Sequence, residues 1–221
     1  MMVARIGVAT AGLFAALIVF AGCDFKWVGI PGSGQIQSED REVGEYSKLD
    51  VSGIGTINVA FGDTPSLKVS CDNNLLELVE TKVVDGQLRI SCKGHISPTE
   101  LRFDIVTKSL SSVEIGGAAT LNLRGAKLDS LGISVNGASV LNADGIVEKL
   151  EIELSGAGKI DTNQLLAKHL KLVISGAGKA DVYASESFDA QVSGAALVNC
   201  LGQPKQVTKN LSGAGRINVV E

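Results

Sequence analysis

The stretch Ser155-Gly156-Ala157-Gly158-Lys159-Ile160-Asp161 decides the fold, because its pattern returns along most of the chain. Ser-Gly-Ala-Gly occurs again at residues 175–178 and 212–215, and four further segments carry degenerate copies. We call the second residue of each copy the marker glycine. The marker glycines are Gly53, Gly117, Gly137, Gly156, Gly176, Gly194 and Gly213. The last six are 20, 19, 20, 18 and 19 residues apart, after a first gap of 64 residues. A repeat of this kind indicates an array of similar structural units.

The residues around each marker glycine alternate between apolar and polar types. Two residues before it every copy has Val, Ile or Leu, and four residues after it six of the seven copies do. Five residues after it every copy has Asn or Asp: Asn58, Asn122, Asn142, Asp161, Asp181, Asn199 and Asn218. A period of two is typical of strands. Each repeat therefore reads as a strand, a turn with the glycine, and a second strand.

The length of the repeat selects among β architectures. About 19 residues is too short for a propeller blade, which needs about 40. It suits one coil of a parallel β-helix, in which like residues stack about 4.8 Å apart. The marker glycines are expected at corners, where positive φ or close backbone approach is needed. We expect the alanine that follows six of them to lie near the axis of the coil. The prediction is an all-β parallel β-helix of 19–20 residues per coil.

The N-terminal part of the domain lacks the regular repeat. Residues 73–78 indicate a short capped helical turn, and residues 101–106 indicate a strand. Residues 82–90 predict a hairpin, because Asp85-Gly86 favours a type I′ turn. We therefore expect a single domain over residues 43–221, with an irregular part (43–110) that contains an antiparallel excursion and a regular part (111–221). The last repeat has no following cap, and an open coil is a sheet edge through which copies of the chain could associate.

The N-terminus has the features of a targeting segment. An apolar run from residue 6 to 21 follows the single charge of Arg5, which fits a secretory signal peptide over residues 1–22. Ala21-Gly22-Cys23 resembles the bacterial lipobox, so Cys23 is the expected lipidation site, although the usual Leu is replaced by Phe20. The alternatives are a plain signal peptide and an uncleaved anchor. Residues 23–42 read as a tether. The lipid would attach the chain to the outer membrane, or to the inner membrane if Asp24 acts as a retention signal.

Composition excludes several classes of protein. The chain has 221 residues, with 26 Gly, nine aromatic residues, 45% apolar residues and a net charge of −4. Glycine without a three-residue period excludes collagen, and the apolar content excludes a disordered chain. The lack of a basic cluster argues against nucleic acid as a partner. With so few rings, the core is expected to consist of Val, Ile, Leu and Ala.

Several of these motifs together resemble one known family. They are the Ser-Gly-x-Gly repeats, Asn74-Leu75-Leu76, the run Glu-Thr-Lys-Val-Val-Asp-Gly-Gln-Leu at residues 80–88, and the Gly-x-Ile-Asn endings. Over residues 46–221 the chain resembles the "putative auto-transporter adhesin, head GIN domain" family. That resemblance implies a bacterial envelope protein, a right-handed parallel β-helix and an adhesin-like role. The family has no established catalytic residues to carry over.

The Asn/Asp position is the best candidate for a site. Stacked Asp161 and Asp181 could hold Ca²⁺ together with Asn142 and Asn199. The alternative, which we favour, is a ladder of amides that satisfies itself along the stack. Lys159 and Lys179 stand two residues before the aspartates and could neutralise them. We expect no metal and no cofactor.

Cysteine and histidine give weaker signals. Cys71 and Cys92 end two alternating segments and could form a disulfide if those strands were neighbours; otherwise they are buried thiols. There is no Cys-x-x-Cys motif, which argues against zinc. His95 and His169 lie in connections, and we expect each to be a solvated surface residue rather than a base. We therefore predict a non-enzymatic, lipid-anchored envelope solenoid with a binding or structural role, whose partners are the membrane and an envelope protein or glycan. The alternative is a polysaccharide lyase or hydrolase on the same fold.

Overall fold

The computed structural model describes residues 29–220, and within them the chain is almost entirely β-structure. One short 3-10 turn, η1, spans Leu76–Leu78. No helix in this part of the chain is long and apolar enough to cross a membrane. The predicted signal peptide (residues 1–22) and the predicted lipidation site Cys23 lie outside the described residues. The strands are β1 (Ile30–Pro31), β2 (Ile36–Arg41), β3 (Lys48–Phe61), β4 (Ser66–Asp72), β5 (Val79–Val84), β6 (Gln87–Cys92), β7 (Ile96–Ser97), β8 (Leu101–Thr107), β9 (Ser112–Leu201), β10 (Gln206–Ser212) and β11 (Arg216–Val219).

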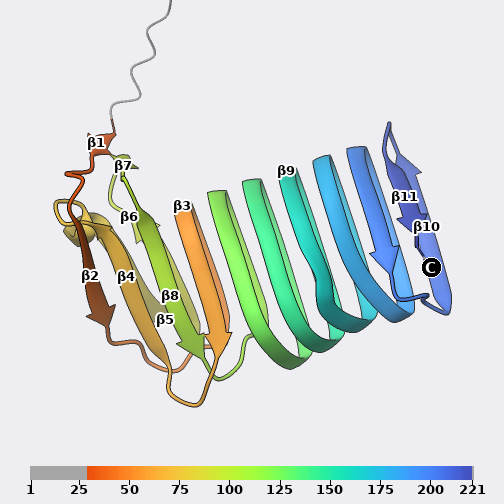
Figure 1. The fold of residues 1–221 in the computed structure, drawn as a ribbon, viewed down its shortest axis with the longest axis horizontal. Helices are drawn as coiled ribbons and strands as arrows, with labels where there is room; N and C mark the ends of the chain where they lie inside the picture. Colours follow the sequence, from red (N-terminus) through yellow and green to blue (C-terminus); the bar gives the residue numbers. More distant parts are fainter. Residues whose placement is uncertain (1–28, 221) are drawn as a thin grey trace, which may run out of the picture.

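The repeats form successive turns of the chain that lie side by side. Figure 1 shows β9 winding through these turns between β3 and the C-terminal strands. Parallel pairing joins β3 to the first part of β9, with Gly53 opposite Gly117 and Asn58 opposite Asn122. β10 and β11 pair in parallel with the last part of β9. Like positions of neighbouring repeats therefore face each other across the ladder.

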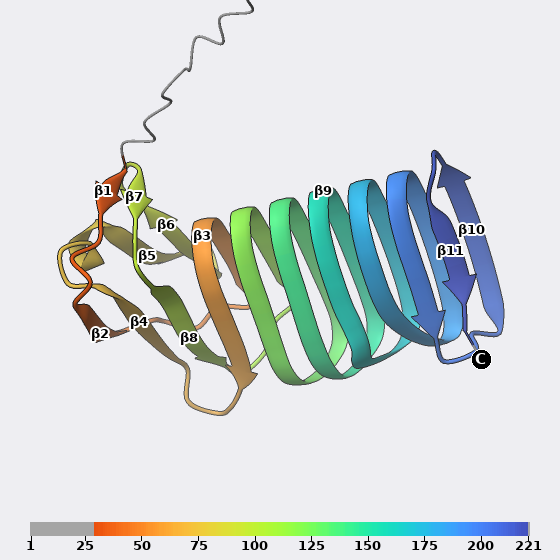
Figure 2. The same ribbon diagram turned by 45° about the horizontal axis from the view of Figure 1, so that its top comes forward.

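Inward side chains fill one continuous aliphatic core. Val113, Ile115, Leu121 and Leu123 are all at most 1% exposed, as the alternation predicts. Figure 2 shows the front and back of each turn, which enclose this core. Large aliphatic side chains supply most of its volume, as expected from the scarcity of rings. Burying each such side chain contributes about 1.5–3 kcal/mol.

The alanines after the marker glycines do not lie near the axis. Ala118, Ala157 and Ala177 are exposed, so that prediction is wrong. The reason is the alternation itself: residues two before and two after the marker face inward, so its immediate neighbour faces out. The small inward residues stand one position later, as in Ala119 and Gly158.

The N-terminal part is antiparallel to a greater extent than predicted. The expected hairpin is β5–β6, with Asp85 at φ 51° and Gly86 at φ 71°. β4 also pairs antiparallel with both β8 and β2. The nine-stranded sheet is therefore mixed, with parallel pairing among the repeats. The helical turn is present as η1, but no side chain caps it.

Part of the predicted tether belongs to the fold. β2 pairs with β4, from Ile36 opposite Asp72 to Arg41 opposite Leu67, and β1 pairs with β7. The first five residues of β2 are exposed and the sixth is half-buried. An edge strand with polar side chains on both faces shows no alternation, which is why its composition resembles a linker.

Asp72 fastens this N-terminal segment to the rest of the domain. Its side chain is fully buried. Its Oδ1 accepts the Gly34 backbone N–H at 2.7 Å, and its Oδ2 accepts the Thr99 N–H at 2.7 Å. Burial alone would raise the pKa of this carboxyl, but the hydrogen bonds from Gly34, Thr99 and Glu100 outweigh it and hold the pKa below its usual range. Asp72 thus holds the segment that leads into β2 against the segment that leads into β8.

The C-terminal end of the core is open. Val207 on β10 is 43% exposed, whereas its partner Phe188 in the previous turn is 1% exposed. Leu211 is 47% exposed and its partner Val192 is 2% exposed. The columns that are buried throughout the stack therefore meet solvent at the last turn.

Candidate binding site

A row of hydrogen-bonded side chains follows the Asn/Asp position across the coils. Asn58 Nδ2 donates to Asp104 Oδ1 at 2.7 Å, and Asn122 Nδ2 donates to Asn58 Oδ1 at 2.9 Å. Asn142 Nδ2 in turn donates to Asn122 Oδ1 at 2.8 Å. We call this row the amide ladder. Every bond points the same way in the sheet, from an amide nitrogen to the side-chain oxygen on the next strand toward β2.

The amide ladder resumes toward the C-terminal end. Asn199 Nδ2 donates to Asp181 Oδ1 at 2.7 Å, and Asn218 Nδ2 donates to Asn199 Oδ1 at 3.0 Å. Lys179 Nζ lies 2.6 Å from Asp181 Oδ2. Burial raises the pKa of Asp181, but donation from Lys179 and Asn199 outweighs it, so the pKa is lowered overall.

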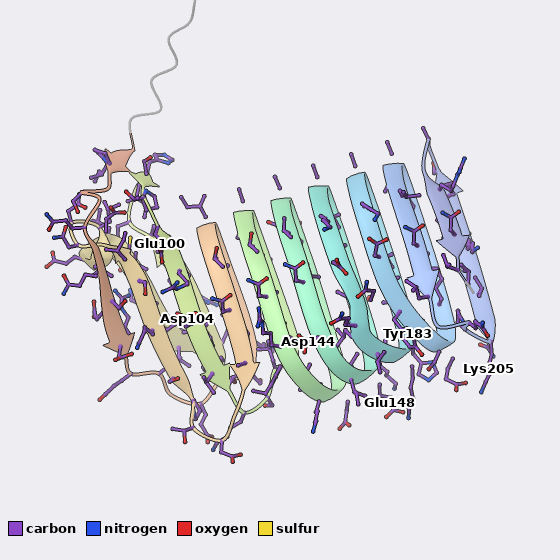
Figure 3. The ribbon with its side chains drawn as sticks, in the orientation of Figure 1. Glu100, Asp104, Asp144, Glu148, Tyr183 and Lys205 are labelled. Atoms are coloured by element: carbon purple, nitrogen blue, oxygen red, sulfur yellow. The ribbon has the colours of Figure 1, made fainter. Side chains whose placement is uncertain are left out.

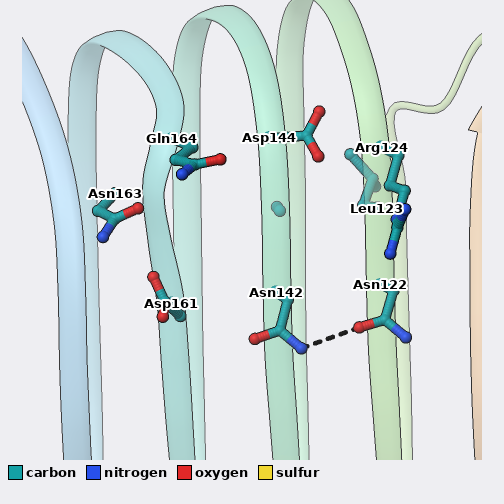
Figure 4. Close-up of a pocket in the computed structure, with 9 residues that line it drawn as sticks. Asn122, Leu123, Arg124, Asn142, Asp144, Asp161, Asn163 and Gln164 are labelled. Atoms are coloured by element: carbon teal, nitrogen blue, oxygen red, sulfur yellow. Dashed lines mark hydrogen bonds between the residues drawn. The ribbon is translucent and has the colours of Figure 1, made fainter.

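Asp161 interrupts the amide ladder. An ionised carboxylate has no N–H to donate, so it cannot bond to the oxygen of the preceding coil. Among the described residues, Asp161 forms no side-chain hydrogen bond with Asn142 or with Asp181. Its ion pair with Lys159 is long, at 4.0 Å. Figure 4 shows Asn142 bonded to Asn122 on one side and facing Asp161 without a bond on the other. Two acceptors therefore face each other at this break.

A groove of about 500 Å³ opens beside the break. Its polar lining beyond the amide ladder consists of Arg124, Asp144, Asn163 and Gln164. Asp144 Oδ1 accepts the Gly125 N–H at 2.7 Å. The side chains of Arg124, Asn163 and Gln164 make no hydrogen bond or ion pair within the part of the chain that the structure describes. The groove thus places donors that have no hydrogen-bond partner in the described chain next to acceptors that have none.

The four predicted site residues share one row but do not converge. Asp181 and Asn199 bond to each other, Asn142 bonds to Asn122, and Asp161 stands at the break. Across residues 29–220, no group of three or more His, Cys, Asp or Glu side chains could hold a metal ion. The hydrogen bonds are those of the amide-ladder alternative, with the bonds on both sides of Asp161 missing.

The sequence analysis missed the second polar row of the groove. Arg124, Asp144 and Asn163 each stand seven residues after a marker glycine, and Tyr183 holds that place in the next repeat. This row lies on the same side of the alternation as the amide ladder. Figure 3 shows Asp144 and Tyr183 along the coils. Because the residue types differ, no identical column marks the row; only the phase of the alternation could have found it.

The marker glycines adopt a conformation that other residues rarely tolerate. Their φ values lie between +122° and +143°. From Gly117 onward, a Cβ on each would overlap the carbonyl oxygen of the marker glycine in the neighbouring coil. These glycines keep successive coils close, which sets the spacing of the amide ladder.

His169 has a partner that the sequence did not indicate. Its Nδ1 lies 2.8 Å from Ser187 Oγ on the exposed surface. A serine nucleophile needs a base that a third group orients. No hydrogen bond of the described residues supplies such a group to His169. The pair has the geometry of a surface contact.

The three described cysteines, Cys71, Cys92 and Cys200, are free thiols. Cys71 on β4 and Cys92 on β6 lie on strands that do not pair with each other, since β4 pairs with β2 and β8, and β6 with β3 and β5. Burial raises the pKa of both thiols, and it raises the pKa of Cys200 to about 11. At neutral pH all three are therefore protonated and unreactive.

These features define a repetitive all-β protein with a polar outer face. Residues 45–204 match the family described as "Putative auto-transporter adhesin, head GIN domain". The chain belongs to this family, as the resemblance of its motifs predicts. No curated protein matches the chain.

Two solved structures share the fold. A "putative adhesin" from Bacteroides fragilis NCTC 9343 has a TM-score of 0.72 and 19% identity, over 87% of this chain and 100% of the other. A "putative lipid binding protein" from Parabacteroides distasonis ATCC 8503 has a TM-score of 0.51 and 20% identity, over 87% of this chain and 99% of the other. At these identities the likeness extends to the fold alone.

Proposed function

We propose that this chain is a non-enzymatic, adhesin-like binding protein of the bacterial cell envelope, anchored by a lipid. The observation that carries the proposal is the rigid polar face, on which outward side chains repeat from coil to coil. Strands held by parallel pairing on both sides present these groups without an ordering cost on binding. Membership of an adhesin-like family supports the same role.

We further infer that the coils form a right-handed parallel β-helix. The in-register parallel pairing of β3, β9, β10 and β11 supports the helix. The hand follows from chain geometry, because parallel crossover connections are right-handed in about 98% of cases. A crystal structure of the chain with left-handed coils would contradict it.

The anchor is the Cys23 thiol, and the membrane is the first partner. After cleavage before Cys23, acylation would hold the folded domain at the membrane surface, in the outer membrane or, if Asp24 acts as a retention signal, in the inner one. We expect Cys23→Ser to abolish incorporation of radiolabelled palmitate in bacteria, with Cys92→Ser as the matched control. Full labelling of Cys23→Ser would refute the anchor.

The second partner is a protein or a glycan of the envelope. Full chain immobilised on beads should retain isolated bacterial envelopes, and a bead coated with heat-unfolded chain is the control. Treatment of the envelopes with protease or with periodate, which cleaves vicinal diols, separates a protein partner from a glycan. Absence of specific retention would refute the proposed binding role.

The enzyme alternative has a separate readout. We expect no new reducing ends and no unsaturated products when the full chain is incubated with polysaccharides. If polysaccharide cleavage co-purifies with the folded chain, the chain is a lyase or hydrolase and the non-enzymatic proposal is wrong.

A further inference from the structure

At Asp161 the half-buried, hydrogen-bonded side chains of the amide ladder lie next to polar groups that have no hydrogen-bond partner in the described residues. Asn142 Oδ1 faces the Asp161 carboxylate, and both are acceptors. Donors without partners surround them on Arg124, Asn163 and Gln164. We propose that this groove binds a neutral glycan through neighbouring hydroxyl groups. The inference rests on the proposed binding function and names the class of its ligand.

A hydroxyl group fits the break because it both donates and accepts. One sugar hydroxyl can donate to Asn142 Oδ1 or to Asp161, while its oxygen accepts from Arg124 or from a neighbouring amide. Separate waters can satisfy these groups one at a time. Vicinal hydroxyls on one ring satisfy several together and release ordered water.

The charges of the groove favour a neutral ligand. Arg124 and Lys159 are balanced by Asp144 and Asp161. An anionic sugar would meet two carboxylates, and a free cation would compete with two side-chain cations. The break therefore supplies hydrogen bonds without a net charge to neutralise.

The size of the groove suits a short stretch of glycan. Its lining comes from three successive coils, which span roughly 10 Å at the usual strand spacing, or about two sugar rings. Tyr183 continues the second polar row beyond Asn163 (Figure 3), outside the residues that line the groove. The paired strands fix the backbone positions of these residues before the ligand arrives, so only their side-chain rotamers are ordered on binding.

Asp161→Asn is the decisive variant. The new amide can donate to Asn142 Oδ1, so it joins residue 161 to the preceding coil and removes the acceptor pair, whereas Asp181, also a carboxylate, still cannot donate to residue 161. We expect unchanged or higher thermal stability together with loss of binding. Binding of the full chain in detergent is measured on an array of neutral oligosaccharides, with uronic-acid oligosaccharides and CaCl₂ as comparison probes.

Wild type should bind neutral oligosaccharides, and Asp161→Asn and Arg124→Ala should each weaken binding at least tenfold. Asp129→Asn, the same change on an exposed residue outside the groove, should stay within twofold of wild type. The inference is overturned if no neutral oligosaccharide binds, if Asp161→Asn binds as wild type does, if uronic acids are preferred, or if Ca²⁺ binding depends on Asp161. If the Asp161→Asn chain still retains bacterial envelopes, the groove is not the binding site, but the proposed binding function holds. If the wild-type chain does not retain envelopes, the proposed function itself is refuted.

Discussion

A marker glycine is required where the backbone of one coil meets the next. Gly156 has φ +128°, and a Cβ there would overlap the Gly137 carbonyl oxygen. Unlike a side chain, this backbone atom cannot move away without disturbing the ladder. We expect Gly156→Ala to lower the free energy of unfolding by about 3 kcal/mol or more, measured by urea unfolding.

Gly116→Ala is the matched control on the same fold. The position has no positive φ, and no atom lies within 4 Å of a Cβ placed there. The change should therefore be neutral or slightly stabilising, by up to about 1 kcal/mol. Equal tolerance at both positions would mean that the marker glycines do not set the approach of the coils.

Asp72 should make stability depend on pH in the acid range. Its carboxylate is buried and accepts two backbone N–H groups, and its pKa in the folded chain is below the usual value. The stabilisation is therefore complete above the unfolded pKa of about 3.9 and is lost as pH falls from there toward the folded pKa. We expect Asp72→Asn to lower Tm by about 5 °C at pH 7, and this deficit to shrink below pH 4.

Differential scanning calorimetry at a series of pH values provides the measurement. Asp63→Asn is the control, because Asp63 is exposed in a loop. A deficit for Asp72→Asn that stays constant down to pH 2 would show that the ionised carboxylate is not the source of the stabilisation.

At the scale of the element, the amide ladder is expected to stabilise the stack. Asn122 donates to Asn58 Oδ1 and accepts from Asn142 Nδ2. Asn122→Ala therefore removes two hydrogen bonds and leaves this oxygen without its donor and this nitrogen without its acceptor. With about 0.5–1.5 kcal/mol for each bond, we expect the free energy of unfolding to fall by about 1–3 kcal/mol. Asn163→Ala, the same change without a hydrogen bond, should stay within about 0.5 kcal/mol. If urea unfolding shows equal losses of free energy for Asn122→Ala and Asn163→Ala, the cause is strand propensity and not the hydrogen bonds of the amide ladder.

The elements differ in how far sequence predicts them. Period-two alternation with identical columns was sufficient for the repeats, since each buried position has a counterpart such as Leu121 opposite Ile57. The Asp85-Gly86 turn was sufficient for the hairpin. β2 was not predicted, because the Asp72 contact and backbone pairing with β4 hold it in the sheet. Neither interaction leaves a pattern in the sequence of β2.

The candidate site follows the same logic. The amide ladder was visible because amide–amide bonds need like residues at one position in every coil. The groove was not, because it depends on departures from the repeat: Asp161 lacks a donor, and the second polar row changes identity from Arg124 to Asp144 to Asn163. A repeat predicts its regular structure well, whereas the proposed groove lies where one copy differs from the others.

At the scale of the whole molecule, the two ends of the stack have opposite character. β2 forms a mostly polar edge at the N-terminal end, next to the segment that Asp72 holds, whereas the apolar columns of β10 are exposed at the C-terminal end. An open edge of this kind pairs readily with another strand. β2 is the other edge of the sheet, but its side chains are mostly polar or charged, so pairing between two copies is expected between their apolar C-terminal ends.

Lys209 is placed to limit that association. In the register of β10 it stands opposite Ala190, which is fully buried in the previous turn, and its Nζ donates to the Ile217 carbonyl at 3.4 Å. A cation at a core position of the last turn must be desolvated before a second edge can cover it. We expect Lys209→Leu to strengthen self-association at least tenfold, equivalent to about 1.4 kcal/mol. Light scattering after size-exclusion chromatography in detergent measures it, and Lys205→Leu, which removes an exposed ion pair with Glu186, is the control. If Lys209→Leu associates no more than wild type, or if Lys205→Leu associates equally, the charge at the open end does not control pairing.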